Sequence, residues 1–158
     1  MGDLVLERLK TFPRLPLAHL PTPVERLRRL EALFPDKPKL WMKRDDLTGL
    51  AQGGNKVRKL EFLIKAAVDE KATAVVTAGG PQSNHCRQTA AAAARLGLDC
   101  HLVLGGEESA NIGNVLLDRL CGARLHWTPR AERESRMVEV ADEIRSDGGS
   151  PIVIPVGG

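Results

Sequence analysis

The chain has 158 residues, of which 42% are apolar and 27% charged, the composition of a globular domain rather than of a disordered or membrane-embedded chain. A net charge of only +3 and an aromatic content of 3%, with no tyrosine, argue against a nucleic-acid-binding protein. No apolar run approaches the ~20 residues of a membrane span, and the N-terminus is too charged for a signal peptide. Three widely spaced cysteines without a CxxC pair predict reduced thiols in a cytoplasmic protein, and the four histidines lack metal-ligand spacing, so no metal site is predicted.

The first third of the chain is irregular in pattern. Residues 11–23 are proline-rich and are expected to be extended. The segment "VERLRRLEALF" at residues 24–34 places its apolar residues on one helical face and predicts an amphipathic helix. "KPKLWMKRDD" at residues 37–46 predicts a strand, and "LTGLAQGG" the loop after it.

From residue 55 onward strands and helices alternate regularly. "NKVRKLEFLIKAAVDE" predicts a helix with Leu60, Leu63, Ile64 and Ala67 on its apolar stripe. The strands predicted after it are residues 73–80, 100–106, 123–128 and 151–158, and the helices between them are residues 83–97, 111–122 and 130–145. Short β-branched runs that alternate with longer helices indicate an α/β fold, a parallel sheet with helices on both faces in three αβα layers.

Ligands of open α/β sheets bind beyond the carboxyl ends of the strands, at the N-termini of the following helices. The most informative of these edges is "TAGGPQSNH" at residues 77–85, where two glycines precede Ser83, Asn84 and His85. Ser83 is a candidate N-cap, and the free backbone N–H groups there suit a carboxylate or a phosphate. The residues alone fit equally well a turn in which Ser83 and Asn84 only cap the helix.

Lys56 stands out because it lies four residues before Leu60, in line with the apolar stripe and at the start of a helix. Burial and the helix dipole would both depress its pKa, which is the condition for a lysine that forms a Schiff base. Alternatively, Lys56 extends along the apolar surface to reach water. A phosphate-binding P-loop is excluded, because Asn55 intervenes before the lysine and Val57 stands where Ser or Thr must bind magnesium.

Two segments together resemble a known family. "KRDDLTGLAQGGNKVRKLEFL" and "TAGGPQSNHCRQTAAAAARLGL" closely resemble the D-cysteine desulfhydrase/1-aminocyclopropane-1-carboxylate deaminase family, and "PTPVERLRRL" and "IPVGG" match its pattern in order. Its members are pyridoxal 5'-phosphate enzymes of fold type II, the tryptophan-synthase-β-like fold. The resemblance therefore implies this cofactor, a small amino acid as substrate, and a homodimer.

The resemblance also implies a role for individual residues. Lys56 would carry the Schiff base to the cofactor and then act as the proton-transfer base. Asn84 would bind the pyridine 3′-oxygen, Lys59 would lie near the phosphate, and Asn55 would also belong to the cofactor-binding residues. The substrate carboxylate would be held by Ser83, Asn84 and His85. Ser83 would be a second candidate for proton transfer.

Within the family, the segment "QSNH" is more similar to the D-cysteine desulfhydrases, because the deaminases typically carry glutamine where His85 stands. The implied reaction is the α,β-elimination of D-cysteine to pyruvate, sulfide and ammonia. A 1-aminocyclopropane-1-carboxylate deaminase and an L-cysteate sulfo-lyase stay open as alternatives.

The chain is also well short of the family's usual length, and its last predicted strand stops at Gly157-Gly158, where a loop and a helix should follow. We therefore expect a truncated protein or a fragment. Residues 1–61 would be the N-terminal part of the large cofactor domain, and residues 62–158 a small α/β domain. The alternatives of another class are a truncated non-catalytic domain and a flavodoxin-like module that binds an anionic ligand.

Overall fold

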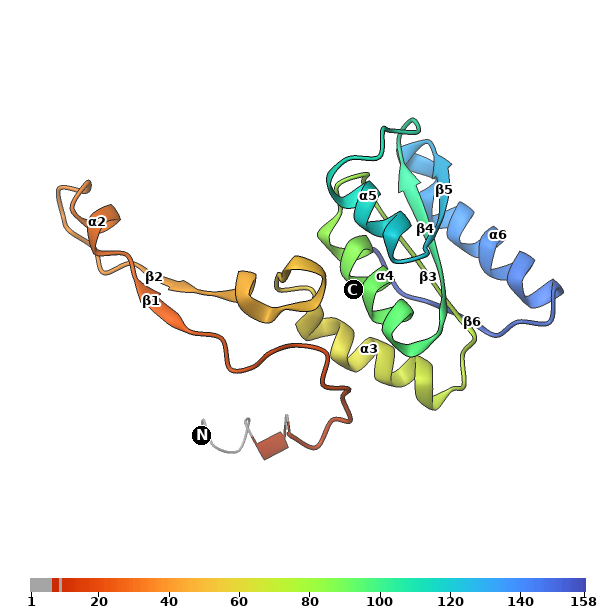
Figure 1. Cartoon of the computed structure of the whole chain (residues 1–158), viewed down its shortest axis with the longest axis horizontal. Helices are drawn as coiled ribbons and strands as arrows, with labels where there is room; N and C mark the ends of the chain where they lie inside the picture. Colours follow the sequence, from red (N-terminus) through yellow and green to blue (C-terminus); the bar gives the residue numbers. More distant parts are fainter. Residues whose placement is uncertain (1–6, 9) are drawn as a thin grey trace.

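Most of the chain is built around one sheet of four parallel strands. A computed structural model describes residues 7–8 and 10–158, and in it the strands stand in the order β5-β4-β3-β6 (Figure 1). Their bounds are β3 Ala74–Gly79, β4 Asp99–Gly105, β5 Arg124–Thr128 and β6 Pro151–Val153. The central strand β3 pairs with β4 on one side and with β6, which follows it by more than seventy residues, on the other.

Helices cover both faces of this sheet. α4 (Asn84–Leu96) lies on one face with α3 (Val57–Asp69) and α5 (Gly113–Leu120) beside it, and α6 (Arg133–Ser146) lies on the other face (Figure 1). The predicted α/β fold with three αβα layers is thereby confirmed. A short 3-10 turn, η3 (Arg130–Glu132), leads from β5 into α6.

The alternation of side chains along the strands explains the two cores. All six residues of β3 are buried; Val75 packs with α3 and α4, whereas Val76 and Ala78 pack against α6. Strands covered on both faces have continuous apolar runs rather than alternating ones, which is what the sequence shows. On the α4 side the run of alanines includes Ala90 and Ala93, both fully buried, and these small side chains let the helix approach the sheet closely.

Residues 24–46, which we call the arm, extend away from the body, by which we mean residues 57–158 (Figure 1). In the arm β1 (Val24–Arg26) pairs antiparallel with β2 (Trp41–Lys43), and α2 (Arg28–Glu31) is a single turn between them. The helix predicted over residues 24–34 is therefore wrong for its first three residues and too long. Glu31 explains the fold-back, because its carboxylate accepts hydrogen bonds from Arg26 Nε (2.9 Å) and from the backbone N–H of Leu40 (2.9 Å).

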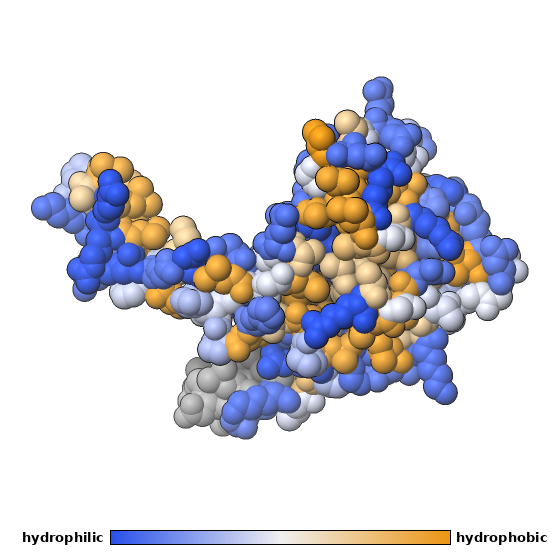
Figure 2. Space-filling view, in the orientation of Figure 1, coloured by the Kyte–Doolittle hydropathy of each residue, from blue (hydrophilic) through white to orange (hydrophobic). Residues whose placement is uncertain are grey.

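The arm leaves its apolar side chains exposed (Figure 2). Leu33 is 77% exposed and Trp41 60% exposed, whereas Leu102 and Leu104 in the central part of the sheet are fully buried. We call this set the exposed apolar residues of the arm, and it comprises Val24, Leu30, Leu33, Phe34, Trp41 and Met42.

The segment between arm and body is more ordered than the predicted loop. It forms two 3-10 turns, η1 (Asp45–Thr48) and η2 (Leu50–Gln52), before α3 begins. The predicted domain boundary between residues 61 and 62 falls inside α3, which is continuous there, and the division stays a prediction. Of the residues that the structure describes, none belongs to a helix long and apolar enough to cross a membrane.

Candidate active site

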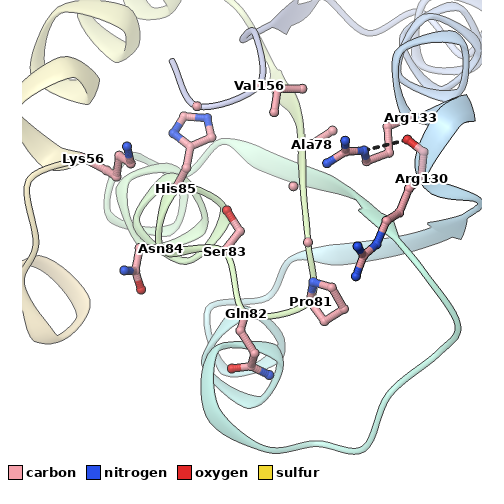
Figure 3. A pocket seen from close by; sticks show the side chains of 13 residues that line it. Lys56, Ala78, Pro81, Gln82, Ser83, Asn84, His85, Arg130, Arg133 and Val156 are labelled. Carbon is pink, nitrogen blue, oxygen red and sulfur yellow. Dashed lines mark hydrogen bonds between the residues drawn. The ribbon is translucent and has the colours of Figure 1, made fainter.

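A cavity of about 660 Å³ opens at the carboxyl end of β3. Four segments of the chain line it: Lys56, the turn from Gly79 to His85, the two arginines Arg130 and Arg133 at the start of α6, and Val156-Gly157 after β6 (Figure 3). This is the edge of the sheet at which the sequence predicts a ligand.

The turn between β3 and α4 depends on glycine. A Cβ atom on Gly79 would lie 2.6 Å from Ser83 Oγ and 2.7 Å from Cys86 Sγ, so a side chain there would push the cap away from the strand. At Gly80 a Cβ would meet nothing within 4 Å, on the side where the cavity opens. Ser83 caps α4, with its Oγ accepting the backbone N–H of Cys86 at 3.2 Å. Ser83 is thus a helix cap and a cavity residue at once, and the helix start that it caps presents backbone N–H groups to an anion.

His85 is buried, and its hydrogen bonds fix its tautomer. The Thr77 hydroxyl donates its single hydrogen to the carbonyl of Ile154 (2.9 Å), so it accepts from His85 Nε2 at 3.0 Å. The proton of the ring therefore lies on Nε2, and Nδ1 is an acceptor. Nδ1 is buried and has no hydrogen-bond partner among the described residues.

Burial, together with the positive charges of Lys56 and Lys59, lowers the pKa of His85 to about 4. His85 is consequently neutral at pH 7, and its unpaired Nδ1 lone pair is available to a hydrogen-bond donor of a ligand.

Lys56 is the residue immediately before α3, and its half-buried side chain reaches into the cavity beside His85 (Figure 3). The helical phase predicted from the sequence is confirmed, because Leu60 and Ile64 on the same stripe are fully buried. The role of Lys56 as the Schiff-base residue stays a prediction. No residue in the described part of the chain forms a hydrogen bond or an ion pair with its amine.

The two glycines before Lys56 are required by their backbone. Gly53 and Gly54 have φ angles of +74° and +127°, which side-chain-bearing residues rarely adopt. A Cβ on Gly53 would in addition lie 1.9 Å from the carbonyl oxygen of Asp46.

Asn84 lines the cavity, but its side chain points away from Lys56 (Figure 3). Its Oδ1 accepts hydrogen bonds from Asn114 Nδ2 (3.1 Å) and Arg87 Nη2 (3.3 Å). The Nδ2 of Asn84 is therefore the atom of this side chain that can donate to a ligand.

Two other residues assigned to the cofactor do not line the cavity. Lys59 donates through Nζ to the carbonyls of Gly157 (2.8 Å) and Gly158 (2.9 Å), and so holds one wall of the cavity rather than facing into it. Asn55 is exposed in the turn before α3. Their cofactor roles stay predictions.

The sequence reasoning missed three residues of the site. Arg130 and Arg133 lie across the cavity from Lys56, and Arg133 Nε donates to the carbonyl of Arg130 at 2.9 Å (Figure 3). They directly follow β5, so the same strand-end rule could have found them had it not been restricted to glycine-rich edges. Thr77, which orients His85, carries no local signal because it reads as an ordinary strand residue.

Cys86 borders the turn but is not a nucleophile. Its thiol is fully buried, and burial raises its pKa to about 12, so the reactive thiolate is absent at neutral pH. All three cysteines, Cys86, Cys100 and Cys121, are free thiols.

The cavity residues fit pyridoxal phosphate on their own chemistry. An amine without a partner suits the aldehyde of the cofactor, and the helix N-terminus suits an anionic group. The unpaired Nδ1 of His85 offers a hydrogen-bond acceptor to such a ligand. A Cβ at Gly80 would meet nothing within 4 Å, so there is also open space for the ligand beside this residue.

Comparison with known proteins agrees with this chemistry. Residues 15–158 match the family model described as "Pyridoxal-phosphate dependent enzyme". The bifunctional D-cysteine desulfhydrase/1-aminocyclopropane-1-carboxylate deaminase of Arabidopsis thaliana is 46% identical over 153 residues, which cover 90% of this chain and 38% of that protein. The D-cysteine desulfhydrase of Klebsiella pneumoniae is 44% identical over 160 residues, which cover 97% of this chain and 48% of that protein. The chain thus spans less than half the length of these curated relatives.

Solved structures show the same relationship. A homologue of 1-aminocyclopropane-1-carboxylate deaminase superimposes with a TM-score of 0.90 at 39% identity, over 100% of this chain and 49% of that one. The cysteine synthase of Entamoeba histolytica superimposes with a TM-score of 0.66 at 14% identity, over 87% and 41%, and shares the fold alone.

Proposed function

The chain belongs to the pyridoxal-phosphate-dependent enzymes, and we propose that the protein carrying it is a D-cysteine desulfhydrase. The reaction is an α,β-elimination in which D-cysteine and water give pyruvate, hydrogen sulfide and ammonia. One observation supports it above all: the unpaired amine of Lys56 and the Ser83–His85 turn line the same cavity.

Lys56 would hold pyridoxal phosphate through a covalent bond between its amine and the cofactor aldehyde. When bound, the cofactor supplies an electron sink for the electron pair left when the substrate Cα loses its proton. The amine of Lys56, when not bonded to the cofactor, would be the base that takes that proton. Asn84 Nδ2 would donate to the ring oxygen of the cofactor, and Lys59 and Asn55 would contribute to its binding.

The turn before α4 would bind the substrate. Its backbone N–H groups and the Ser83 hydroxyl suit the carboxylate, because the positive end of the α4 dipole is directed at them. His85 would accept a hydrogen bond from a ligand N–H or O–H through Nδ1 rather than bind the carboxylate itself, because its lowered pKa leaves the ring neutral at pH 7 and its one proton, on Nε2, is donated to Thr77. The Ser83 hydroxyl would be a second group that transfers a proton.

We further infer a homodimer in the cytoplasm that acts on a small amino acid. The resemblance to the desulfhydrase family supports this proposal, and it supports equally a division of the chain into part of a large cofactor domain to residue 61 and a small domain from residue 62. Deamination of 1-aminocyclopropane-1-carboxylate is the second candidate, favoured by the bifunctional relative from Arabidopsis thaliana.

The test begins with the covalent bond. The protein is incubated with pyridoxal phosphate, its long-wavelength Schiff-base absorbance is recorded, and the bond is reduced with borohydride and located by peptide mass spectrometry. We expect the label on Lys56, and we expect Lys56→Ala to abolish both the band and, by roughly 10³-fold or more, the turnover. Lys65→Ala, on the same helix but outside the cavity, is the matched control and should keep both.

The substrate is tested by comparing sulfide release from D-cysteine with 2-oxobutanoate release from 1-aminocyclopropane-1-carboxylate. Activity on the second compound alone would contradict the desulfhydrase proposal. Retention of the absorbance band by Lys56→Ala would contradict the site.

A further inference from the structure

Two side chains of α4 reach across to the loop that precedes Lys56. The carbonyl oxygen of Gly53 accepts hydrogen bonds from Arg87 Nη2 (2.9 Å) and from Gln88 Nε2 (2.6 Å). Arg87 is 5% exposed and Gln88 fully buried, so neither bond competes with bulk water. Both lone pairs of this one carbonyl are thus engaged by a helix more than thirty residues away in sequence.

The loop is shaped to receive these donors. A Cβ on Gly54 would lie 2.4 Å from Gln88 Nε2, so the approach of the amide requires glycine at that position. On its other side the loop is braced by Thr48, whose Oγ1 lies 2.9 Å from both the backbone N–H and the carbonyl of Gly54. The backbone two residues before Lys56 is therefore held from two directions.

The backbone after Lys56 is held as well. Arg58 donates to the Asp45 carboxylate through Nε (2.8 Å) and Nη2 (2.7 Å). Lys56 consequently lies between two fixed positions, Gly54 and Arg58, while its own amine is left available to the cavity.

The guanidinium of Arg87, which binds Gly53, also contacts the Ser83–His85 turn. Arg87 Nη2 donates to Asn84 Oδ1 (3.3 Å), and Asn114 Nδ2 donates to the same oxygen (3.1 Å). Arg87 therefore connects the Lys56 loop to the substrate-binding turn through one group.

These polar side chains are costly if they serve packing alone. Gln88 Oε1 and Arg87 Nε are buried and have no partner among the residues that the structure describes. Unpaired buried polar atoms destabilise a fold, and an apolar side chain of similar size would fill the same space without them. This loss of stability is explained if the hydrogen bonds from Arg87 and Gln88 to Gly53 determine the position of the loop before Lys56.

We propose that Arg87 and Gln88 are positioning residues, which fix the Lys56 loop against the Ser83–His85 turn so that the lysine amine and the carboxylate-binding groups face one substrate. The inference rests on the proposed function, in which these two groups act on the same molecule. Neither residue touches the reacting atoms.

The test uses Gln88→Met, which keeps the length of the side chain and removes the donor to Gly53. In the cofactor-free protein we expect the backbone amides of residues 50–56 to exchange hydrogen about tenfold faster, while those of α6 are unchanged. Covalent labelling of Lys56 by pyridoxal phosphate, trapped with borohydride, should require an about tenfold higher cofactor concentration. In the turnover assay kcat should fall with little change in KM.

Thr89→Val is the matched control, because it also removes a buried hydrogen bond of α4 (Thr89 Oγ1 to the carbonyl of His85, 2.9 Å) but none to the loop. It should leave the exchange of residues 50–56 unchanged. Arg87→Lys, which keeps the charge, should retain more of the labelling than Arg87→Met, and this pair carries the test if Gln88→Met fails to fold.

Unchanged exchange of residues 50–56 in Gln88→Met, or an equal increase in α6, would overturn the proposal. If the loop responds as expected but wild-type Lys56 takes no cofactor, the proposed function fails while the connection between loop and turn stands. The exchange and labelling measurements thus separate the two hypotheses.

Discussion

The arm and the body carry similar proportions of apolar side chains but use them differently. In the body, β3 is covered on both faces by helices, and every one of its residues is buried. In the arm, two three-residue strands pair only with each other, and the exposed apolar residues of the arm stay uncovered. A two-stranded pair is at best marginally stable in water. The comparison teaches that an apolar pattern determines an element only where another surface covers it.

The largest difference between the two regions should appear on deleting a leucine from each. Leu102 in β4 is fully buried, so Leu102→Ala should lower the free energy of unfolding by about 2–5 kcal/mol. Leu33 in the arm is 77% exposed, and Leu33→Ala should change it by less than about 0.5 kcal/mol. Urea denaturation followed by circular dichroism measures both. An equally large loss in Leu33→Ala would mean that the exposed apolar residues of the arm are covered in solution.

A second difference lies in how the two regions hold a carboxylate. Asp118 in α5 is fully buried, neither of its oxygens has a partner among the described residues, and burial raises its pKa from 3.8 to about 7 against the opposing charge of Arg87. The folded state then keeps a proton that the unfolded chain releases, so Asp118 makes the protein less stable as the pH rises from about 4 to 7. We expect Asp118→Asn to gain stability over the wild type through this window, by at most about 4 kcal/mol, in urea unfolding at a series of pH values.

The matched variant in the arm is Asp46→Asn. Its effect on the free energy of unfolding should depend on pH with the opposite sign. The hydrogen bond from Arg44 lowers the pKa of Asp46, so this carboxylate stabilises the fold above the usual pKa of aspartate and loses its effect only as the pH falls through the lowered folded-state value. A pH-independent difference between Asp118→Asn and wild type would rule out a buried proton at Asp118.

The smallest expected change in the free energy of unfolding comes from the contact between α3 and the segment that leads to the arm. Glu61 of α3 is buried, and its Oε1 accepts the backbone N–H groups of Leu17 and Ala18, each at 3.0 Å, in the segment that leads to the arm. Glu61→Ala leaves these donors unpaired and should lower the free energy of unfolding by about 1–3 kcal/mol.

Glu61→Gln keeps an acceptor oxygen and should recover most of the loss. Glu70→Ala, at the exposed end of the same helix, is the control. Thermal and urea unfolding measure all three variants, and a loss in Glu70→Ala as large as in Glu61→Ala would refute the account.

The sequence predicts the body well because its periodicities are those of elements packed on both sides. It fails in the arm, where Glu31 and the pairing of β1 with β2 override a helical pattern over residues 24–34. Local signals of glycine, N-cap and helical phase singled out Lys56 and the Ser83–His85 turn separately, and only the resemblance to a known family placed them in one site; both line the same cavity. They could not place Lys59, because the carbonyls that hold its amine are about a hundred residues away.

The neutral state of His85 was likewise beyond local reasoning. It depends on burial and on charges from another helix, together with the hydroxyl of Thr77, and none of these is visible in the turn itself. Arg130 and Arg133, in contrast, could have been found from the sequence, because they follow the carboxyl end of β5, where ligands of such sheets bind. They were missed because their strand end is not rich in glycine.

The position of β6 beside β3 has a consequence for the order in which the protein matures. Thr77, which orients His85, donates a hydrogen bond to the carbonyl of Ile154, a residue 77 positions later. This bond can therefore form only after the ribosome has synthesised β6 and the residue that follows it. Contacts between such distant residues form slowly, because the long loop between them must first lose its freedom. A nascent chain that already has β3, α4 and β4 therefore carries every residue of the Ser83 turn without the support that fixes its histidine. The orientation of His85 at this edge should therefore be fixed only after β6 has joined the sheet.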